Sequence, residues 1–463
     1  MEKTKESKIK VGLEIHGYLQ TKEKLFCRCK AVRHAAKQEI NPNTFICPIC
    51  TGQPGAKPML PNSEAIKKII QIALMLNCKI NRKFAFQRKH YDWPDLPKGY
   101  QETISGAYSI PVAEKGKFEV GITEIHLEED PASWNPETGC IDYNRSGLPL
   151  VEIVTEPDFS SSEEVVLWLK KLILTLSYIK AIDKNAGIKA DVNISTGKTG
   201  FKERVEIKNI NSIENIKKAI EFEASRQITE KVQRETRRYD EKKGITIKMR
   251  EKEEQADYRF IPDPDLPIIK LKEKSISEIE SKLPESPQEK LDKLIKKHKL
   301  NKKDAEILYS NLELVEFFEK IAEKINPGFA LPWVTIELLR VLNYNKKILE
   351  EVDIKPEHFS ELLEAVKSGK LTELKAKQIL NSFIPKSFSI KSQLKKEERI
   401  TDKKEIEIFA KEAMNKNKQA VQDYKQGKKE AFNFLLGEIM KISKRRADFQ
   451  TAREILARLL KEK

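Results

Sequence analysis

The segment VGLEIH, residues 11–16, alternates apolar and polar side chains. Side chains two positions apart lie on the same face of a strand, so the three apolar residues would face a core while Glu14 and His16 would share the opposite face. The segment VGITEIHLEED, residues 120–130, repeats this arrangement. Both segments therefore predict half-buried strands that carry acidic and histidine side chains on their uncovered face.

Similar alternation and short apolar runs predict four further strands. They are Leu150–Thr155, Ala190–Ser195, Arg204–Ile210 and Gly244–Met249. Two helices would interrupt the strands: Ser63–Leu76, with Ser63 as the candidate N-cap, and Ser161–Ile182, in which Ser161 and Glu164 have the spacing of a capping box.

Helical patterns replace the strands in the second part of the chain, where Lys/Glu faces alternate with apolar stripes. We therefore expect an α+β protein with three domains. A mixed-sheet domain would span residues 1–283, a helical domain residues 284–395, and a small, basic, all-helical tail residues 396–463.

The composition excludes fibrous and wholly disordered proteins, because 34% of the 463 residues are charged, 39% are hydrophobic and only 18 are glycine. No apolar run reaches the ~18 residues that a membrane span needs, and the N-terminus does not resemble a signal peptide. We expect a soluble, cytoplasmic protein with no membrane partner. Its net charge of 86 − 71 = +15 favours a polyanionic partner without naming one.

Four of the six cysteines are clustered in two pairs. They are Cys27, Cys29, Cys47 and Cys50. Two close pairs separated by a ribbon-length loop are the ligand pattern of tetrahedral zinc, and six cysteines in a chain of this length do not make a disulfide scaffold. We predict a structural zinc site in an insertion at about residues 26–51, with free thiols as the alternative. Cys78 and Cys140 are interpreted as packing residues.

Acidic side chains recur on strands whose other residues are hydrophobic. Glu152 lies in an apolar run, Asp191 shares a strand face with Asn193, and Glu206 shares one with Lys208. A single strand of this kind is usually only the solvated side of a sheet, but four or five favour a carboxylate cluster that needs Mg²⁺ or Mn²⁺ as counter-charge. Magnesium held in this way is typical of nucleotide-phosphate sites, so these residues favour metal-assisted phosphoryl chemistry.

Eight motifs follow one another along the chain. They are VGLEIHGYLQTKEKLFCRC, NTFICPICTGQPGAKPMLP, YDWPDLPKGYQ, GITEIHLEED, DYNRSGLPLVEIVTEPD, RVEIKNINS, QRETRRYDEKKG and ADYRFIPDPDLP. In this order they resemble the B subunits of tRNA-dependent amidotransferases, and the resemblance covers essentially the whole chain. The related E-type subunits carry a large insertion before the helical region, which this chain lacks.

The resemblance implies a cradle-like mixed sheet similar to that of carboxylate–amine ligases, which binds the 3′ end of Glu-tRNA(Gln) or Asp-tRNA(Asn). ATP and Mg²⁺ would serve to phosphorylate the side-chain carboxylate of the attached amino acid. Ammonia released from glutamine by an amidase A subunit would then displace phosphate, and a small C subunit would complete a heterotrimer. The enzyme would be a ligase that forms a carbon–nitrogen bond with glutamine as amido donor.

The family's motifs also assign site residues. The catalytic and magnesium-binding positions would be Glu14, His16, Glu128, Glu129 and Glu152, with Asp191 as a further magnesium ligand. Lys208, Arg204 and Arg145 would face nucleotide phosphates or the acceptor end, or would only form structural ion pairs. The family commonly has EIHVQL where this chain has EIHGYL, and it also differs around Asp191, but neither change removes a proposed ligand.

Two alternatives stay open at the level of the sequence. A zinc-containing RNA-binding protein without catalysis would need the cysteines and the tail, in which residues 401–463 hold 16 Lys and Arg against 10 Asp and Glu, but it would not need the aligned acids. A small-molecule carboxylate–amine ligase would need the acids but no tRNA. On the leading interpretation, the basic tail follows tRNA phosphates.

Overall fold

The computed structural model describes residues 8–32, 40–106, 109–182, 188–197, 201–251, 258–391, 394 and 398–462. The chain forms two compact units, Met1–Pro287 and Gln288–Lys463. The first contains a large mixed sheet and the second is helical, which confirms the predicted fold class. The proposed boundary between the helical region and the tail, at residues 395 and 396, lies outside the described residues.

The first unit contains short and long strands together with four helices. The strands are β1 (Lys8–Tyr18), β2 (Lys79–Ile80), β3 (Lys83–Phe84), β4 (Gln87–His90), β5 (Tyr100–Thr103), β6 (Ala113–Phe118), β7 (Val120–Glu129), β8 (Ser133–Trp134), β9 (Ile141–Asp142), β10 (Pro149–Thr155), β11 (Ile188–Gly197), β12 (Val205–Ile210), β13 (Glu235–Asp240), β14 (Ile245–Glu251), β15 (Arg259–Pro262) and β16 (Ile269–Lys270). The helices are α1 (Ser63–Met75), α2 (Ser162–Tyr178), α3 (Ile213–Thr229) and α4 (Glu273–Glu280).

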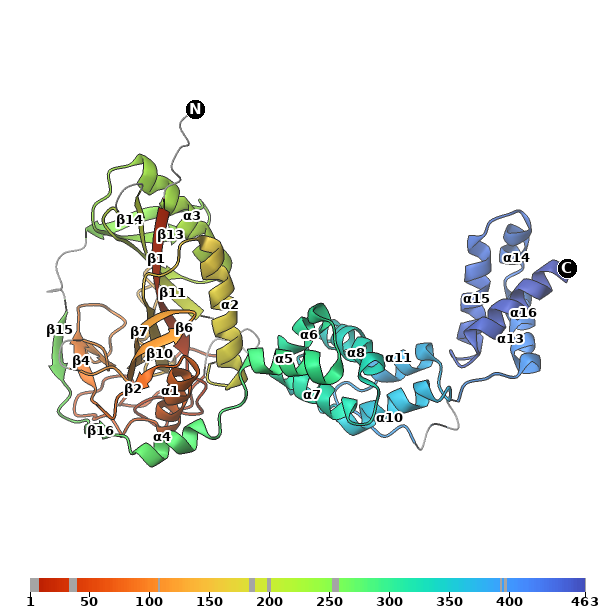
Figure 1. The fold of residues 1–463 in the computed structure, drawn as a ribbon, viewed down its shortest axis with the longest axis horizontal. Helices are drawn as coiled ribbons and strands as arrows, with labels where there is room; N and C mark the ends of the chain where they lie inside the picture. The colour runs from red at the N-terminus through yellow and green to blue at the C-terminus, as the bar shows by residue number, and fades with distance from the viewer. Residues whose placement is uncertain are drawn as a thin grey trace. The chain divides into compact units, whose positions relative to one another are not determined.

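Within the described residues, twelve strands form one sheet, and Figure 1 labels most of them. Its main order is β14-β13-β12-β11-β1-β10-β7-β5-β4-β15, and β6 joins β7 to β2. Strands β12 and β13 are parallel, whereas the other neighbours along this path are antiparallel. The six predicted strands are confirmed within a few residues as β1, β7, β10, β11, β12 and β14.

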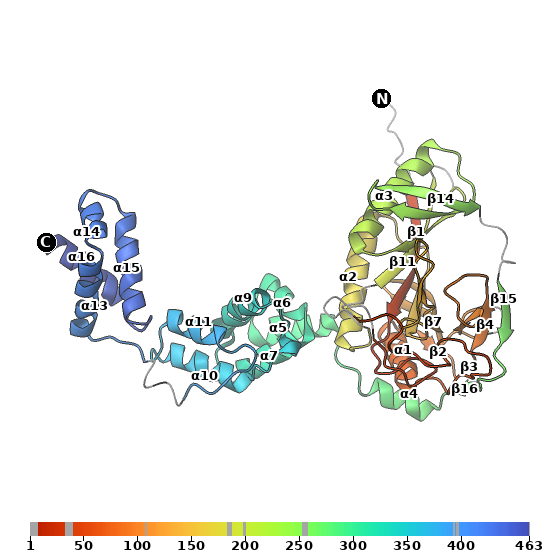
Figure 2. The ribbon, with the colours of Figure 1, turned by 180° about the vertical axis from the view of Figure 1, so that it is seen from behind.

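Strand β1 lies in the middle of the sheet, and its side chains point alternately to the two faces of the sheet. Val11, Leu13 and Ile15 are buried in the main core together with residues of α1, α2 and α3. Figures 1 and 2 show α2 and α3 side by side against this sheet. Because the helices cover the apolar face, Glu14 and His16 are left on the other face, as the alternation predicts.

Several helix predictions need correction. The N-cap of α1 is Asn62 rather than Ser63, because the Asn62 side chain accepts the backbone N–H groups of the first turn. Ser161 caps α2 as expected, but the helix ends at Tyr178 rather than Ile182, since Lys180 takes a left-handed conformation with φ of 48°. Helix α3 is absent from the prediction because its few apolar residues lie among many charged ones.

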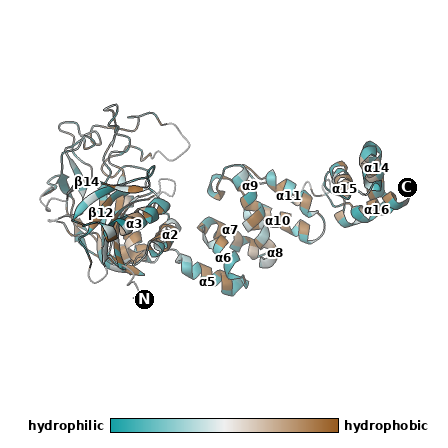
Figure 3. Ribbon diagram, turned by 90° about the horizontal axis from the view of Figure 1, so that it is seen from above, coloured by the Kyte–Doolittle hydropathy of each residue, from teal (hydrophilic) through white to brown (hydrophobic). Residues whose placement is uncertain are grey.

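The second unit is built from amphipathic helices (Figure 3). They are α5 (Pro287–His298), α6 (Lys302–Tyr309), α7 (Leu312–Ala322), α8 (Pro327–Pro332), the π-helical η3 (Trp333–Leu338), α9 (Leu339–Tyr344), the 3₁₀-helical η4 (Leu349–Glu351), α10 (Pro356–Lys367), α11 (Glu373–Asn381), α13 (Lys403–Lys416), α14 (Lys418–Lys425), α15 (Glu430–Ile442) and α16 (Phe449–Glu462). They enclose two hydrophobic clusters, one formed by residues between Leu291 and Ile390 and one by residues between Ile400 and Leu460. Among the described helices, none is both long and apolar enough to cross a membrane.

Candidate active site

The pairing of neighbouring strands builds an acidic face on the sheet. His16 on β1 lies opposite Glu152 on β10, and Glu14 lies opposite Asp191 on β11. Directly opposed residues on paired strands have their Cβ atoms ~5 Å apart, so their side chains meet. The register therefore brings together residues that are far apart in the sequence.

His16 and Glu152 form a group with Glu128 of β7, which we name the histidine cluster. Nε2 of His16 lies 3.4 Å from a carboxylate oxygen of Glu152 and 3.7 Å from one of Glu128. Burial opposes the charge on His16, but the two carboxylates outweigh it and raise the pKa of the imidazole to about 9. Burial and repulsion from Glu152 raise the pKa of Glu128. The cluster thus holds more negative charge than one imidazolium can balance.

A second group, the lysine cluster, consists of Glu14, Asp191, Glu206 and Lys208. Nζ of Lys208 lies 2.7 Å from Asp191 and 2.5 Å from Glu206. Burial opposes the charge on Lys208, but Asp191 and Glu206 outweigh it and raise the pKa of the ammonium group. Asn193 donates a hydrogen bond of 3.1 Å to Glu14, so the amide belongs to the same group.

Both clusters fit a divalent cation. In each, ligand atoms from three acidic or histidine side chains lie within 4.8 Å of one another. In the lysine cluster, Oδ1 of Asn193 is buried and has no hydrogen-bond partner among the described residues, and such an acceptor is costly unless a donor or a cation satisfies it. Oxygen-rich sets with at most one histidine suit Mg²⁺, and Lys208 already supplies one positive charge to its own cluster.

Glu129, which the sequence assigns to the same site, lies on the other face of β7. Neighbouring residues of a strand point to opposite faces, so Glu129 cannot join Glu128 in the histidine cluster. Its carboxylate instead pairs with Lys98 and accepts the backbone N–H of Glu102 at 3.1 Å.

Arg145 is engaged by the protein itself. Its guanidinium lies 3.1 Å from the carboxylate of Asp130 and donates to the backbone carbonyls of Pro131 and Ala132. The structure therefore places Arg145 as a support for the loop that follows β7, which agrees with the structural alternative for this residue.

A cavity of about 220 Å³ adjoins the lysine cluster. Arg204 and Lys10 line it together with Glu14 and Gly12. Of the three cations assigned to phosphate or acceptor binding, Lys208 thus lies within the lysine cluster and Arg204 lines the neighbouring cavity, while Arg145 lies elsewhere.

The sequence prediction leaves two residues of the acidic face without a role. Glu206 is a member of the lysine cluster, and His126 on β7 lies opposite Glu152 with its Nε2 2.9 Å from Glu124. Period-two alternation places both on the acidic face, but their neighbours on adjacent strands follow only from the register of the sheet.

The four clustered cysteines converge as predicted. The Sγ atoms of Cys27, Cys29, Cys47 and Cys50 all lie within 4.8 Å of one another, and those of Cys47 and Cys50 are 3.9 Å apart. Tetrahedral zinc–sulfur bonds of about 2.3 Å require a sulfur–sulfur separation of about 3.8 Å, so the set fits zinc. Part of the intervening loop, residues 33–39, lies outside the described residues.

The surroundings of Cys50 favour its thiolate, whereas the hydrogen bond with Cys50 raises the pKa of Cys27 and burial raises the pKa of Cys29. The hydrogen bond with Cys27 lowers the pKa of the Cys50 thiol, and the nearby ammonium of Lys24 lowers it further. Lys24 is only 1% exposed and donates to the carbonyl of Tyr143 at 3.1 Å. The packing prediction holds for Cys78, which is buried, but it is wrong for Cys140, which is exposed.

Comparison with known families accounts for almost the whole chain. Residues 9–277 match the GatB/GatE catalytic domain, and residues 316–460 match the GatB domain. The chain belongs to the GatB family. The resemblance inferred from the eight motifs is thereby confirmed, and both acidic clusters lie in the part that matches the GatB/GatE catalytic domain.

Similar members of the GatB family occur in several archaea. The B subunit of the aspartyl/glutamyl-tRNA(Asn/Gln) amidotransferase of Methanocaldococcus jannaschii is 42% identical, with 97% of each chain covered. The protein of the same name from Methanothermobacter thermautotrophicus is 43% identical over 97% of this chain and 99% of its own. That from Methanopyrus kandleri is 40% identical over 98% of each chain.

Zinc content tests the cysteine cluster. We expect about one zinc ion per chain in purified protein, and Cys27→Ser or Cys50→Ser should lose it because a structural zinc site uses all four ligands. Metal analysis and a chelator-release assay measure the content. Cys140→Ser, an exposed cysteine outside the cluster, should keep its zinc, and equal zinc in all three variants would contradict the site.

The pH dependence of stability tests the buried carboxyl of Glu102. Burial, with Asp263 and Glu129 nearby, raises the pKa of Glu102 to about 10. At a pH between the ordinary pKa of glutamate and this value, Glu102 therefore holds a proton in the folded protein but not in the unfolded chain. The free energy of unfolding should therefore fall with rising pH between about 5 and 9, by up to about 1.4 kcal/mol per unit. Glu102→Gln stays neutral and should show a flatter profile in denaturant unfolding. Parallel profiles for the two proteins would refute this assignment.

Proposed function

We propose that this chain is the B subunit of a tRNA-dependent amidotransferase. It uses ATP to phosphorylate the side-chain carboxylate of glutamate on tRNA(Gln), of aspartate on tRNA(Asn), or of both. It then forms the amide with ammonia that an amidase A subunit releases from glutamine, in a heterotrimer with a small C subunit. The observation that carries the proposal is the histidine cluster, which lies beside the lysine cluster on the face of the sheet opposite the apolar core.

The two clusters are the groups that would hold Mg²⁺ and the phosphates of ATP. His16, Glu128 and Glu152 supply the first set of ligand atoms, and Glu14, Asp191 and Glu206 supply the second. Bound magnesium supplies charge neutralisation for the transferring phosphoryl group. The cavity beside Glu14, with Arg204 and Lys10 in its lining, is a hollow that offers cations to a nucleotide.

The proposed chemistry explains why the chain presents positioned charges rather than a nucleophile. A carboxylate is a poor electrophile, and transfer of the γ-phosphoryl group to its oxygen creates an acyl phosphate and releases ADP. Ammonia attacks the acyl carbon, phosphate leaves, and the nitrogen loses a proton. Phosphoryl transfer depends chiefly on alignment and charge balance, which rigid, paired strands provide.

Basic surfaces of the helical unit support tRNA binding. In α15, Leu435, Leu436 and Ile439 are buried while Lys441 at the end of the helix is exposed, and Lys444 and Arg445 follow in the exposed turn. The helix thus separates an apolar face from a basic one. Exposed cations of this kind bind nucleic-acid phosphates without reading their sequence.

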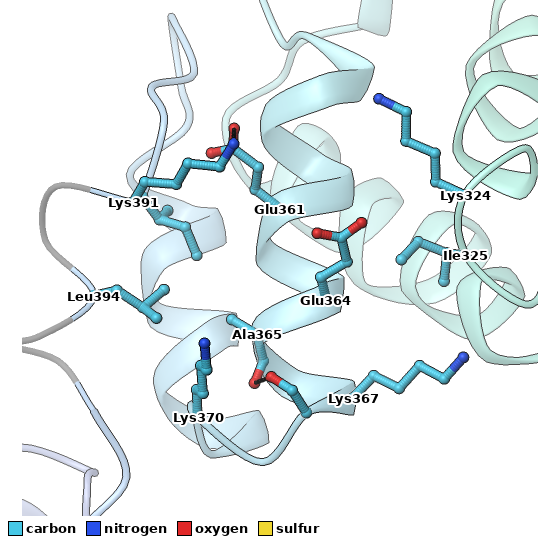
Figure 4. Close-up of a pocket in the computed structure, with 11 residues that line it drawn as sticks. Lys324, Ile325, Glu361, Glu364, Ala365, Lys367, Lys370, Lys391 and Leu394 are labelled. Atoms are coloured by element: carbon cyan, nitrogen blue, oxygen red, sulfur yellow. Dashed lines mark hydrogen bonds and ion pairs between the residues drawn. The ribbon is translucent and has the colours of Figure 1, made fainter.

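A further basic hollow lies among the helices of the same unit (Figure 4). It has a volume of about 580 Å³, and its lining includes four lysines and two glutamates. The lysines are Lys324, Lys367, Lys370 and Lys391. Lys391 lies 3.3 Å from Glu361 and pairs with it. The remaining three lysines outnumber the one remaining glutamate, so the rim carries an excess of positive charge. The hollow lacks the acidic clusters and therefore suits contact with the RNA backbone rather than catalysis.

The two alternative functions make different demands on the acidic face. An RNA-binding protein without catalysis has no use for five carboxylates and a histidine held on adjacent strands at a cost in desolvation. A small-molecule ligase has no use for the basic tail. Neither alternative accounts for both features.

The decisive experiment measures ATP consumption by the reconstituted complex, with Glu-tRNA(Gln) and Asp-tRNA(Asn) supplied separately and ammonia as nitrogen donor. ADP and the amide on tRNA should appear with one or both acceptors. Turnover without any tRNA would favour the small-molecule ligase. No turnover, despite tRNA binding, would favour the RNA-binding protein.

Removing single carboxylates tests the role of the histidine cluster. Glu128→Gln and Glu152→Gln should lower amide formation about 100-fold or more, because each loses a charged metal ligand. Filter binding should show unchanged affinity for aminoacyl-tRNA. Glu119→Gln serves as the matched control, since this exposed carboxylate pairs with Lys171 at the surface. Wild-type rates in the two cluster variants would refute the proposal.

The tail is tested by removing charge and then by truncation. Replacing Lys441, Lys444 and Arg445 together by Gln should weaken tRNA binding and reduce the slope of log Kd against log salt by about 2 to 3. Deletion of the residues after position 396 should raise the KM for aminoacyl-tRNA and leave intrinsic ATP turnover largely intact. Titration at several salt concentrations gives the slopes. Unchanged tRNA affinity in the truncated protein would exclude the tail from binding.

A further inference from the structure

Two tryptophans form an aromatic pair in the first unit, of which Trp93 is exposed and Trp134 is half-buried. Trp93 lies in the segment between β4 and β5, and Trp134 lies in β8. Their ring centroids are 5.8 Å apart with the planes at 88°, so the edge of one indole meets the face of the other. Trp93 is 55% exposed. A large aromatic ring held open to solvent in this way offers a flat surface on which another ring can stack.

Contacts near both tryptophans tie together the two segments that carry them. Arg145 binds Asp130 and the two residues after it, and its guanidinium also lies 4.0 Å from Asp95, two residues beyond Trp93. The backbone N–H of Ala132 donates to the carbonyl of Asp95 at 2.8 Å, which ties the two segments together. Arg145 is thus a positioning residue for the aromatic pair.

The pair adjoins the acidic face. The hydroxyl of Tyr18 donates to Asp130 at 2.7 Å, and Tyr18 shares its face of β1 with His16. On the other segment, Tyr91 lies close enough to Asp95, Glu128 and Asp130 for their charges to raise the pKa of its hydroxyl further, beyond the larger effect of burial. The two segments that carry the tryptophans are therefore anchored at the Tyr18 end of β1, the end of the strand that is nearer to His16 than to Gly12.

The cavity with Arg204 lies toward the other end of the same strand. Its lining includes Gly12, and Tyr18 lies six positions farther along the strand, which is about 20 Å at ~3.3 Å per residue. The lysine and histidine clusters lie between these two ends. A nucleotide with its phosphates on the clusters and its base near Arg204 would leave the tryptophan end free.

We propose that Trp93 and Trp134 form the stacking surface for the unpaired base at the 3′ terminus of the tRNA. This inference rests on the proposed function. The amino acid is esterified to the terminal ribose, so when its side-chain carboxylate reaches the histidine cluster, the terminal base must lie nearby. Proteins commonly hold unpaired bases by stacking them on aromatic side chains, and the contact tolerates any base because each has a π face.

The test uses the reconstituted complex with Trp93→Ala and Trp93→Phe. Stacking of one base is worth enough that Trp93→Ala should raise the Kd for aminoacyl-tRNA about tenfold. Trp93→Phe keeps an aromatic face and should retain most of the affinity. The KM for ATP should stay within about twofold of the wild type in both variants. Tyr344→Ala, which removes an 86% exposed ring from the helical unit, is the matched control.

A tRNA that lacks its terminal nucleotide separates stacking from general damage. The wild type should bind this shortened tRNA about tenfold more weakly than the full-length one, whereas Trp93→Ala should bind the two equally. An increase in the KM for ATP, equal discrimination by both proteins, or loss of the partner subunits from the Trp93→Ala complex would each overturn the inference. Failure of the wild type to form the amide, with discrimination between the two tRNAs intact, would refute the proposed function alone.

Discussion

Repulsion between carboxylates on one face of β1 and its neighbours is the constraint on which the rest of the site depends. Glu128 and Glu152 both lie within 4 Å of the His16 imidazole, and Asp191 and Glu206 both lie within 3 Å of the Lys208 ammonium group. Such side chains can stay together in a folded protein only if cations balance them and if a rigid backbone resists their separation. The sheet provides the rigidity, because each of these residues lies on a strand that is paired on both sides.

The opposite face of the same strands provides the stability that offsets this cost. Val11, Leu13 and Ile15 are at most 1% exposed, and the helices α1, α2 and α3 pack over them. One strand thus serves two purposes with alternate residues. A shift of register by one position would turn the acids into the core, so the hydrophobic face also fixes the geometry of the acidic one.

The groups proposed to bind the substrates thus follow one another along strand β1. Cations at the Gly12 end border a cavity, two carboxylate clusters follow, and an aromatic pair lies beyond Tyr18. The basic surfaces of the helical unit add affinity for a polyanion without contributing to the chemistry. Arg145 shows how these parts depend on one another. Its guanidinium lies near both Asp95 and Asp130 and so connects the segment that carries Trp93 with the segment that carries Trp134.

The sequence by itself determined the strands with clear alternation, the helical second unit, the family, and the four cysteines as one ligand set, because each of these depends on local periodicity or spacing. It also placed Glu14, His16, Glu128 and Glu152 on the strand faces that point away from the apolar core. Only the tertiary structure decided which of these residues meet, since strand order and register are properties of pairs of distant segments. For this reason only the tertiary structure shows that the acids form two clusters, that Glu206 belongs to one of them and that Glu129 pairs with Lys98. It also shows that Trp93 contacts Trp134, although no local pattern connects their segments.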